Sequence, residues 1–453
     1  MFTKSISTKR NRIILPDKVQ KYIDKYFIPG WQIESRDEKN YDYIVVIPAI
    51  HEFENIKILL HSLSQNDDDS LKKALILFVI NNSVESSVET KIDNQNTIAY
   101  LREKISTPHA SHFSKLELNP NLKLAFIDAS SPGKELPAMD AGVGLARKIG
   151  MDLALTRFNY SDSISRKLII CLDCDCTVEP DYLRAIMNFD RKSFQAGYIK
   201  FAHRMPEDED GQKAIICYEI VLRYYVLGLS YARSPFAFHT IGSTMVCNYE
   251  SYIRIGGMNK RKAAEDFYFL EKLAKITKIQ CIDTTTVYPS SRKSWRVPFG
   301  TGQRINRYLA STHDEYLLHD PEIFEVVKKW LAIFHSDDNF SAAEYIHRAK
   351  TISNELFTFL IDNSFESSWD KILNNSKDIQ QIQKQKIMWF DGFRTMKLIH
   401  YLRDTIFPQK PMFTALERLF DKMNVSFPSR VQANELPPLD VQMNYLNLLR
   451  KLT

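Results

Sequence analysis

Residues 168–176 of the 453-residue chain read Leu-Ile-Ile-Cys-Leu-Asp-Cys-Asp-Cys, an apolar run that ends in two aspartates two positions apart. A short apolar run bounded by a polar turn is typical of a strand buried on both faces of a sheet. The run predicts that Asp173 and Asp175 follow the end of one strand, where both carboxylates can face a single Mg²⁺ or Mn²⁺ ion. Taken alone, the triplet favours a solvated acidic turn, so a metal site depends on support from the surrounding sequence.

Apolar runs alternate with helical patterns around this stretch. Runs of strand type occur at 44–47, 75–80 and 122–127, and the spacing typical of amphipathic helices occurs at 55–63 and 145–157. Strands that alternate with helices indicate an α/β sheet wrapped by helices. In such sheets ligands bind at the carboxyl ends of the strands. We therefore expect the functional residues to follow the strands.

Three regions are predicted along the chain: a lead-in at 1–40, an α/β domain at 41–305 and an α-helical region at 306–453. In the third region Ser341 and Glu344 form a capping-box pattern, which predicts a helix that extends through Leu360. Residues 387–403 form another aromatic-rich helical pattern. Packing against the first domain is favoured for this second helix over a substrate-binding groove.

The composition indicates a folded, soluble protein. Hydrophobic residues make up 44% of the chain and charged residues 25%, enough to bury a large core. The net charge of +5 is too weak and too mixed to indicate a nucleic-acid partner. No stretch approaches the roughly 20 consecutive apolar residues of a membrane span, and the basic N-terminus lacks the apolar segment of a secretory signal. We expect a cytoplasmic location, with peripheral contact at the inner membrane face left open by the Tyr- and Arg-containing segment 222–238.

The cysteines show no spacing typical of a disulfide framework, so reduced thiols are expected. Cys171, Cys174 and Cys176 allow a soft-metal site as an alternative. That alternative is weak because Cys171 lies within the apolar run and no His or second Cys pair follows at zinc-like spacing.

Several motifs surround the aspartate turn in a fixed order. They are Ile-Val-Val-Ile-Pro-Ala-Ile-His-Glu at 44–52, Val-Ile-Asn-Asn-Ser at 79–83, Ala-Gly-Val-Gly-Leu-Ala-Arg-Lys-Ile-Gly-Met at 141–151, Asp-Cys-Asp-Cys-Thr-Val-Glu-Pro-Asp-Tyr-Leu at 173–183, Gly-Ser-Thr-Met-Val at 242–246, Gly-Gly-Met at 256–258 and Ala-Glu-Asp-Phe at 264–267. This ordered set resembles glycosyltransferase family 2, the inverting nucleotide-sugar enzymes of the GT-A fold, over about residues 43–305. The resemblance implies a GT-A type mixed, mainly parallel sheet flanked by helices, with the α-helical C-terminal region added.

The resemblance also implies roles on the donor side. Pro48 and Glu52 would border the nucleotide, Asn81 would approach its base, and Arg147 would approach the phosphates. Asp173 would contact the donor, and together with Asp175 it would hold the metal, which stabilises the departing diphosphate as a Lewis acid.

Two positions depart from the family's pattern. His51 stands where the family usually has Asn, and Ile80 stands where it has the Asp that commonly contacts the base. An isoleucine can supply only an apolar contact, so the identity of the nucleotide stays open.

On the acceptor side the resemblance makes Asp266 the catalytic base and lets Glu265 orient the acceptor. A hydroxyl is a poor nucleophile until its proton is removed, which gives a carboxylate there a chemical task. A helix N-terminus, where acidic residues are favoured by the helix dipole, is the structural alternative. The cationic, glycine-rich segment 288–304 would add Arg292, Arg296 and Arg304 around the diphosphate.

The sequence therefore predicts a metal-dependent inverting glycosyltransferase that uses Mn²⁺ or Mg²⁺. It would move a sugar from a nucleotide-diphosphate donor to a sugar, glycan or lipid-linked hydroxyl acceptor, in glycan, glycolipid or polysaccharide biosynthesis. The Gln-x-x-Arg-Trp signature of processive synthases is missing, which favours a single addition.

Two alternatives stay open. A non-catalytic sugar-nucleotide-binding assembly subunit is weakened by the retention of Asp173, Asp175 and Asp266. A sugar nucleotidyltransferase would ordinarily need a Gly-rich basic turn after the first strand, and the turn at 48–52 contains no glycine.

Overall fold

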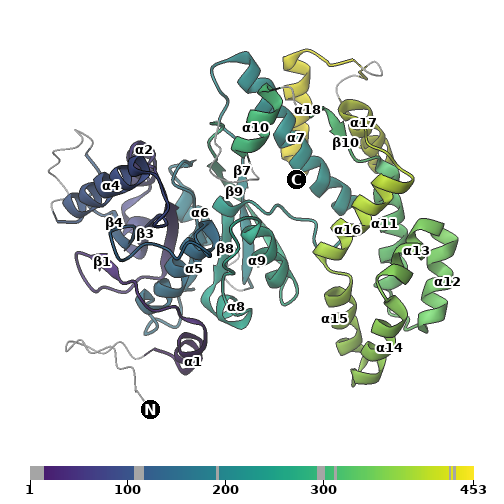
Figure 1. Cartoon of the computed structure of the whole chain (residues 1–453), viewed down its shortest axis with the longest axis horizontal. Helices are drawn as coiled ribbons and strands as arrows, with labels where there is room; N and C mark the ends of the chain where they lie inside the picture. Colours follow the sequence, from purple (N-terminus) through teal and green to yellow (C-terminus); the bar gives the residue numbers. More distant parts are fainter. Residues whose placement is uncertain are drawn as a thin grey trace. The chain divides into compact units, whose positions relative to one another are not determined.

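The computed structural model describes residues 15–106, 117–189, 193–292, 301–310, 314–427, 430–431 and 435–453. The chain forms two compact units. Figure 1 shows its helices and strands, coloured by position along the sequence. Unit 1 takes in Met1–Lys200, Gly242–Phe269 and Ile282–Val287, and unit 2 takes in Phe201–Ile241, Leu270–Cys281 and Tyr288–Thr453. This division differs from the boundaries expected at 305 and 306, because α7 (Glu209–Tyr231) packs against helices of the C-terminal region.

Unit 1 is built on a sheet that contains nine strands in the described part of the chain, in the order β1-β4-β3-β2-β5-β8-β7-β9-β6. The strands are β1 (Ile33–Ser35), β2 (Tyr43–Ala49), β3 (Ala74–Asn81), β4 (Lys123–Ala129), β5 (Leu168–Cys171), β6 (Thr177–Val178), β7 (Ala196–Phe201), β8 (Met245–Asn248) and β9 (Ile279–Tyr288). The central neighbours β4, β3, β2 and β5 run parallel, whereas β1 on β4 and β8 on β5 and β7 are antiparallel. All four strands predicted from apolar runs are confirmed.

Helices cover both faces of this sheet. They are α1 (Asp17–Tyr26), α2 (Phe53–Ser64), α3 (Asp68–Lys73), α4 (Val88–Ser106), α5 (Val143–Ala154), the 3₁₀ turn η1 (Leu155–Arg157), α6 (Tyr182–Asn188), η2 (Gly242–Thr244), α8 (Tyr249–Arg254) and the start of α9 (Glu265–Ala274). Val45 and Ile47 pack in the core shared with α2 and α4, while Val46, which points to the opposite face, packs against Gly150 of α5. Strands buried on both faces explain the continuous apolar runs in the sequence.

The predicted fold class is confirmed by this arrangement. The sheet is mixed with a parallel centre, helices flank it, and the C-terminal region is α-helical, as the GT-A type description required. Gly150 shows how closely the layers approach, because a Cβ at this position would lie 2.4 Å from a methyl carbon of Val46. A side chain there would push α5 off the sheet.

Unit 2 is mainly helical. Besides α7, its elements are α10 (Thr301–Leu309), α11 (Pro321–Phe334), α12 (Ala342–Ile352), α13 (Asn354–Asp362), α14 (Phe365–Asn375), α15 (Ile379–Trp389), α16 (Gly392–Thr405), α17 (Met412–Met423), α18 (Leu439–Leu452) and the short strands β10 (Leu317–Leu318) and β11 (Lys410–Pro411). Its core is rich in aromatic side chains, and the rings of Trp330 and Phe334 stack with centroids 5.0 Å apart.

Two helices predicted in this region are each divided in the structure. The Oγ atom of Ser341 accepts a hydrogen bond from the amide of Glu344, which confirms the predicted start of α12. The helix ends before Ser353, whose own hydroxyl accepts bonds from two amides of α13. In the same way Asp391 caps α16 within the predicted helix at 387–403. A capping side chain competes with the helical hydrogen bonds, so each run is broken in two.

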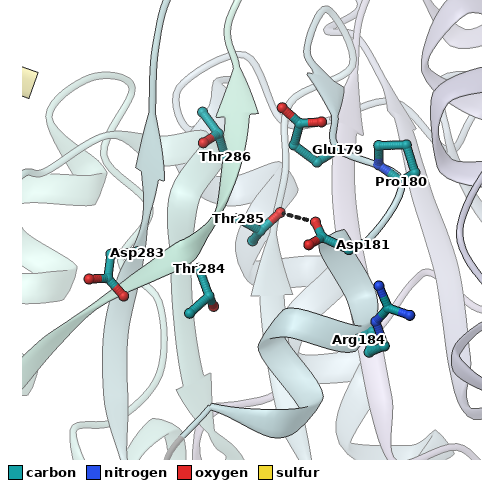
Figure 2. A pocket seen from close by; sticks show the side chains of 8 residues that line it. All are labelled: Glu179, Pro180, Asp181, Arg184, Asp283, Thr284, Thr285 and Thr286. Atoms are coloured by element: carbon teal, nitrogen blue, oxygen red, sulfur yellow. Dashed lines mark hydrogen bonds between the residues drawn. The ribbon is translucent and has the colours of Figure 1, made fainter. Parts of the chain in front are cut away.

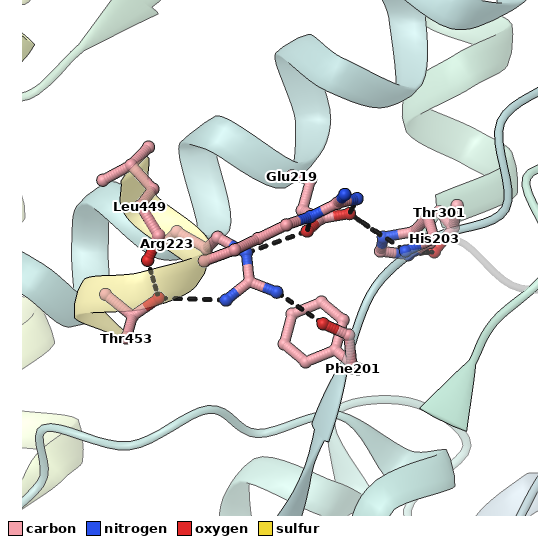
Figure 3. Close-up of polar contacts among 8 residues, drawn as sticks. Phe201, His203, Glu219, Arg223, Thr301, Leu449 and Thr453 are labelled. Atoms are coloured by element: carbon pink, nitrogen blue, oxygen red, sulfur yellow. Dashed lines mark hydrogen bonds and ion pairs between the residues drawn. The ribbon is translucent and has the colours of Figure 1, made fainter. Parts of the chain in front are cut away.

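A buried ionic network joins distant parts of unit 2 (Figure 3). The Glu219 side chain is fully buried on α7, and its carboxylate accepts hydrogen bonds from Arg223 at 2.8 Å, from Arg450 at 2.7 Å and from the Nδ1 position of His203 at 3.0 Å. Burial alone would raise the pKa of Glu219, but these partners hold it well below its usual range. The carboxylate therefore stays charged inside the unit.

Within the described residues, α7 is the one helix long and apolar enough to cross a membrane by length and composition. Its apolar window is 67% buried inside the protein, as in the core helix of a soluble domain.

Candidate active site

The strand register gathers the predicted donor-side residues at one edge of the sheet. In the parallel pairs, Ala49 of β2 lies beside Ile80 of β3, and Val46 lies beside Cys171 of β5. The turn at 48–52 therefore lies between the segments that follow β3 and β5. Pro48, Glu52, Asn81 and Asp173 consequently occupy neighbouring positions at the carboxyl edge.

Asn81 connects the ends of strands β2 and β3 through hydrogen bonds. It is 4% exposed, and its side-chain amide donates to the carbonyls of Ala49 at 3.0 Å and Val79 at 3.1 Å. In this structure the Asn81 amide therefore forms hydrogen bonds to the backbone. Its contact with a nucleotide base stays a prediction.

Asn94, on α4, links the same turns and is not suggested by any sequence motif. It is 1% exposed, and its amide donates to the carbonyl of Asn81 at 3.0 Å and to the side chain of Asn82 at 2.8 Å. Its own side-chain oxygen accepts a bond from the His51 amide at 3.0 Å. Asn94 thus fixes the two turns that would border a nucleotide, through contacts that depend on how α4 packs.

Strained backbone precedes a predicted site residue in two places. His51 and Ala264 both have a φ of 56°, in the left-handed region that residues other than glycine rarely adopt. His51 comes directly before Glu52, and Ala264 directly before Glu265. Such strain costs about 1–3 kcal/mol per residue and persists where surrounding contacts impose it. The Asn94 bond to the His51 amide and a 2.8 Å bond from Asn259 to the Glu265 carbonyl are contacts of that kind.

Arg147 is the centre of the candidate site. Its side chain is 2% exposed on α5, and its two terminal nitrogens form ion pairs with Asp173 and Glu265. Burial by itself lowers the pKa of Arg147, but the two carboxylates raise it overall, so the guanidinium stays charged. Asp173 and Glu265 lie 26 and 118 positions from Arg147, and Arg147 therefore joins the aspartate turn to the Glu-Asp pair.

Two glycines make room for this arrangement. A Cβ at Gly242 would lie 2.4 Å from a terminal nitrogen of Arg147, and a Cβ at Gly144 would lie 2.3 Å from the carbonyl oxygen of Arg261. Real Cβ atoms do not approach so closely, so both positions need glycine. Gly242 and Gly144 both belong to motifs noted in the sequence, and the structure supplies the reason for them.

Asp266 is the second residue of α9 and adjoins the buried ion pair. Its Oδ1 atom accepts a bond from the Phe267 amide at 2.7 Å. Burial and, to a lesser extent, the Glu265 charge raise the pKa of Asp266, the Arg147 charge partly offsets this rise, and the resulting pKa is about 7. A carboxyl group that titrates near neutral pH is suited to take a proton from a hydroxyl. Glu265 is only 4% exposed and is engaged by Arg147.

The two carboxylates of the aspartate turn could supply some of the ligands of a metal ion, with a substrate supplying the others. The Asp173 side chain is 35% exposed, and Asp175 is also partly exposed. Across the described ranges, no three His, Cys, Asp or Glu side chains are grouped so that they could hold a metal ion by themselves. Mg²⁺ is commonly held by one or two carboxylates together with substrate phosphates, and two carboxylates match that donor set.

The nearby cysteine thiols are buried in the core. Burial raises the pKa of Cys171 to about 12, which favours the thiol over the thiolate that binds metals.

Two of the three arginines predicted in segment 288–304 lie among the described residues. Arg292 and Arg304 belong to unit 2, where Arg304 forms a 3.0 Å ion pair with Glu315, and Arg296 lies outside the described residues. Their contact with a diphosphate stays a prediction.

A polar cavity of about 410 Å³ opens beyond the aspartate turn in unit 1 (Figure 2). Glu179, Asp181 and Arg184 line one side, and residues 283–286 of β9 line the other. The Thr285 hydroxyl donates to Asp181 at 3.0 Å across the cavity. The carboxylates, hydroxyls and guanidinium suit a polar ligand. Asp181 belongs to a motif noted in the sequence, but its contact with Thr285 of β9 was not foreseen.

Fold and site together define a class, an α/β protein with a mixed, mainly parallel sheet and acidic residues grouped at its carboxyl edge. No family model matches the chain, and no curated protein matches it in sequence. Among solved structures it is similar to Staphylococcus aureus TarS 1–349 in complex with UDP-GlcNAc, at 14% identity and a TM-score of 0.36, over 88% of this chain and 98% of that one. It is also similar to the mannosyltransferase PcManGT from Pyrobaculum calidifontis in complex with GDP-Man and Mn²⁺, at 13% identity and a TM-score of 0.36, over 86% and 94%. Identities and TM-scores this low do not show that this chain binds the ligands of either protein.

Proposed function

We propose that this protein is a metal-dependent inverting glycosyltransferase that moves a sugar from a nucleotide-diphosphate donor to a hydroxyl acceptor. The observation that carries the proposal is the position of Arg147 between Asp173 and Glu265. This buried contact brings the acidic turn suited to a donor diphosphate next to Asp266, a carboxyl group suited to activate an acceptor. Neither group alone would distinguish catalysis from an acidic turn or an acidic helix start.

On the donor side, Asp173 and Asp175 would hold Mn²⁺ or Mg²⁺. The ion supplies positive charge to a diphosphate as it departs. Asp173 accepts from Arg147, which fixes the carboxylate in place before a donor arrives. Pro48, Glu52 and Asn81 would border the nucleotide.

On the acceptor side, Asp266 would take the proton of the attacking hydroxyl. The hydroxyl oxygen forms a bond to the anomeric carbon while the bond from that carbon to the diphosphate oxygen breaks on the opposite face. The proton ends on the Asp266 carboxylate, and the configuration at the anomeric carbon is inverted. A pKa of about 7 leaves a large share of Asp266 ionised at neutral pH and still makes it an effective base.

Arg147 and Glu265 would act as positioning residues. Both side chains are at most 5% exposed, and each is engaged by protein groups of opposite charge. The Glu265 charge also contributes to the raised pKa of Asp266, so it tunes the base as well as holding Arg147.

A donor screen tests the proposal. The full chain would be incubated with Mn²⁺ and a panel of UDP- and GDP-sugars, with simple sugars and lipid-linked sugars as acceptors, and nucleoside diphosphate release would be measured. We expect acceptor-stimulated release that falls by about 100-fold or more in Asp175→Asn, because a charge that stabilises the leaving group is lost. Asp69→Asn is the matched control, since that side chain is 88% exposed on α3 and should leave the rate unchanged.

Other outcomes would contradict the proposal in distinct ways. Release of pyrophosphate from a nucleoside triphosphate and a sugar phosphate would indicate a nucleotidyltransferase. Donor binding without acceptor-stimulated release would indicate a non-catalytic binder. A product that keeps the donor's anomeric configuration by NMR would contradict the inverting mechanism.

A further inference from the structure

A second cavity in unit 1, of about 310 Å³, lies at the other edge of the sheet from the candidate active site. Lys123, the first residue of β4, lines this cavity, whereas the candidate active site follows the last residues of the strands. The other walls come from the segment after β1 and from the end of α4. Ser35 pairs with Ala125, so the chain that leaves β1 passes the start of β4.

The cavity gathers positive charge. Arg36, Lys39, Lys104 and Lys123 line it, and Asp37 is the one acidic residue among the lining side chains. The Asp37 Oδ1 atom accepts a bond from the Lys39 amide at 3.0 Å and lies 4.0 Å from the Arg157 guanidinium. Four cations around one small cavity repel one another, and an anion among them would remove that repulsion.

Arg157 holds the cationic segment in place. It is 7% exposed, and its guanidinium donates to the Ser35 hydroxyl at 3.0 Å, to the Asp37 carbonyl at 3.0 Å and to the Lys39 carbonyl at 2.8 Å. Arg36 and Lys39 therefore project from a backbone that is fixed before any ligand arrives. A fixed backbone reduces the entropy that the segment loses on binding a ligand.

Lys104 places a cation in the buried part of the cavity. It is 3% exposed near the end of α4, and burial lowers the pKa of its ammonium group. Leu118 and Leu122 form an apolar part of the lining. Low local dielectric strengthens the attraction between a buried cation and a bound anion.

We propose that this cavity binds the phosphoryl group of an anionic ligand. Four cations suit a group that carries more than one negative charge and several acceptor oxygens, which a phosphate does and a carboxylate does not. The phosphoryl group belongs to a soluble phosphate compound or to a lipid headgroup. The site is independent of the proposed sugar transfer and of the aspartate turn.

Calorimetry on the full chain tests the site with inorganic pyrophosphate as the probe. A chelator is added so that no metal-dependent binding at the aspartate turn contributes. We expect one saturable site whose affinity falls about tenfold or more in the double variant Arg36→Gln/Lys123→Gln, because charge-assisted hydrogen bonds are lost. Lys72→Gln, a surface lysine on α3 with a 52% exposed side chain, and Asp175→Asn should bind like wild type.

Vesicle sedimentation separates the two sources of the phosphoryl group. Binding of pyrophosphate alone indicates a soluble ligand. Added co-sedimentation with phosphatidic acid vesicles, but not with phosphatidylcholine vesicles, indicates a lipid headgroup if the double variant loses it. Thermal unfolding confirms that the double variant is folded. Lack of saturable binding to both probes, or equal binding by wild type and a folded double variant, would overturn the proposal.

Discussion

Arg147 combines three features: near-complete burial, two acidic partners, and a close contact between its guanidinium and Gly242. A buried charge is stable only while its partners are present. Asp173 and Glu265 each compensate the Arg147 charge, and the loss of Arg147 would leave the Glu265 carboxylate buried without a counter-charge. The ion pairs therefore serve stability and site geometry together.

Replacing Arg147 should destabilise the fold as well as the site. Arg147→Met is expected to lower the free energy of unfolding by about 3–5 kcal/mol, because Glu265 is left buried without a counter-charge. Arg147→Lys should recover part of this loss, since a lysine restores the charge but cannot bind two carboxylates as a planar fork. Urea unfolding followed by circular dichroism measures both changes.

Arg102 offers a matched control for that measurement. It pairs with Glu34 at the surface and is 51% exposed, so Arg102→Met should change the free energy of unfolding by less than about 1 kcal/mol. Equal losses for Arg147→Met and Arg102→Met would contradict the role given to Arg147.

The raised pKa of Asp266 predicts how the rate depends on pH. A general base works only when deprotonated, so kcat/KM should rise with pH up to about 7 and level off above it. Below pH 7 each unit of pH should lower kcat/KM about tenfold. Buffers from pH 5.5 to 8.5, with Asp69→Asn as control, provide the test. A profile that is flat across this range would show that Asp266 does not act as the base.

Sequence patterns identified Asp173, Asp175, Glu265 and Asp266 as candidates because each belongs to a local motif. They did not reveal that Arg147 binds two of them. Ion pairing between positions 118 residues apart depends on how α5 and α9 are brought together. Asn94 was not predicted for the same reason, because only the packing of α4 brings its side chain into contact with the turns that follow β2 and β3.

At the scale of elements, the close approach of η2 to α5 positions the charged groups of the site as much as the strand ends do. Gly242 opens η2 directly against the Arg147 guanidinium, and the φ of 56° at Ala264 sets the direction in which α9 begins. Short connections, more than the sheet itself, therefore place the charged groups.

Gly242→Ala should disable the site without removing any charged group. The added methyl would lie 2.4 Å from an Arg147 nitrogen, so the guanidinium has to move away from Asp173 or Glu265. We expect kcat/KM to fall about 100-fold, as for a displacement of about 1 Å in a catalytic site. Gly133→Ala is a control for a glycine whose Cβ meets open space, although its φ of 82° makes some loss of stability expected there. Equal activities of Gly242→Ala and wild type would contradict the close contact.

Helices and strands were predicted best where the pattern of apolar residues determines the type of element. The four apolar runs became β2 to β5, and the helix expected at 55–63 became α2. The breaks at Ser353 and Asp391 within two predicted helices were missed because one capping side chain outweighs a continuous helical pattern. Strand β9 was missed as well, since the three consecutive threonines at 284–286 and the polar residues before them do not form an apolar run.

At the scale of the whole chain, α7 decides the division into units. Its sequence lies within the expected α/β domain, but Glu219 accepts from Arg450 and Arg223 donates to Thr453, both near the end of the described chain. Sequence periodicity shows that a helix has a buried face without showing what covers that face. The boundary expected near residue 305 therefore differs from the observed division.

Breaking this network should destabilise unit 2. Glu219→Gln leaves Arg223 and Arg450 without their shared buried counter-charge, and we expect the free energy of unfolding to fall by about 3–5 kcal/mol. Tryptophan fluorescence during urea unfolding reports on this unit, because Trp330 and Trp369 lie in its core. Glu209→Gln, 68% exposed at the start of the same helix, should stay within about 1 kcal/mol of wild type. A smaller loss for Glu219→Gln than for Glu209→Gln would contradict this account.

The most direct test of the proposed chemistry is acceptor-dependent turnover in Asp266→Asn. With donor and Mn²⁺ saturating, kcat should fall by about 10²- to 10⁴-fold while donor affinity stays within about threefold of wild type, because asparagine keeps the shape of the side chain but cannot take the proton. Asp69→Asn should retain full activity. An Asp266→Asn variant with undiminished kcat would contradict the assignment of Asp266 as the base and, with it, the proposed mechanism of sugar transfer.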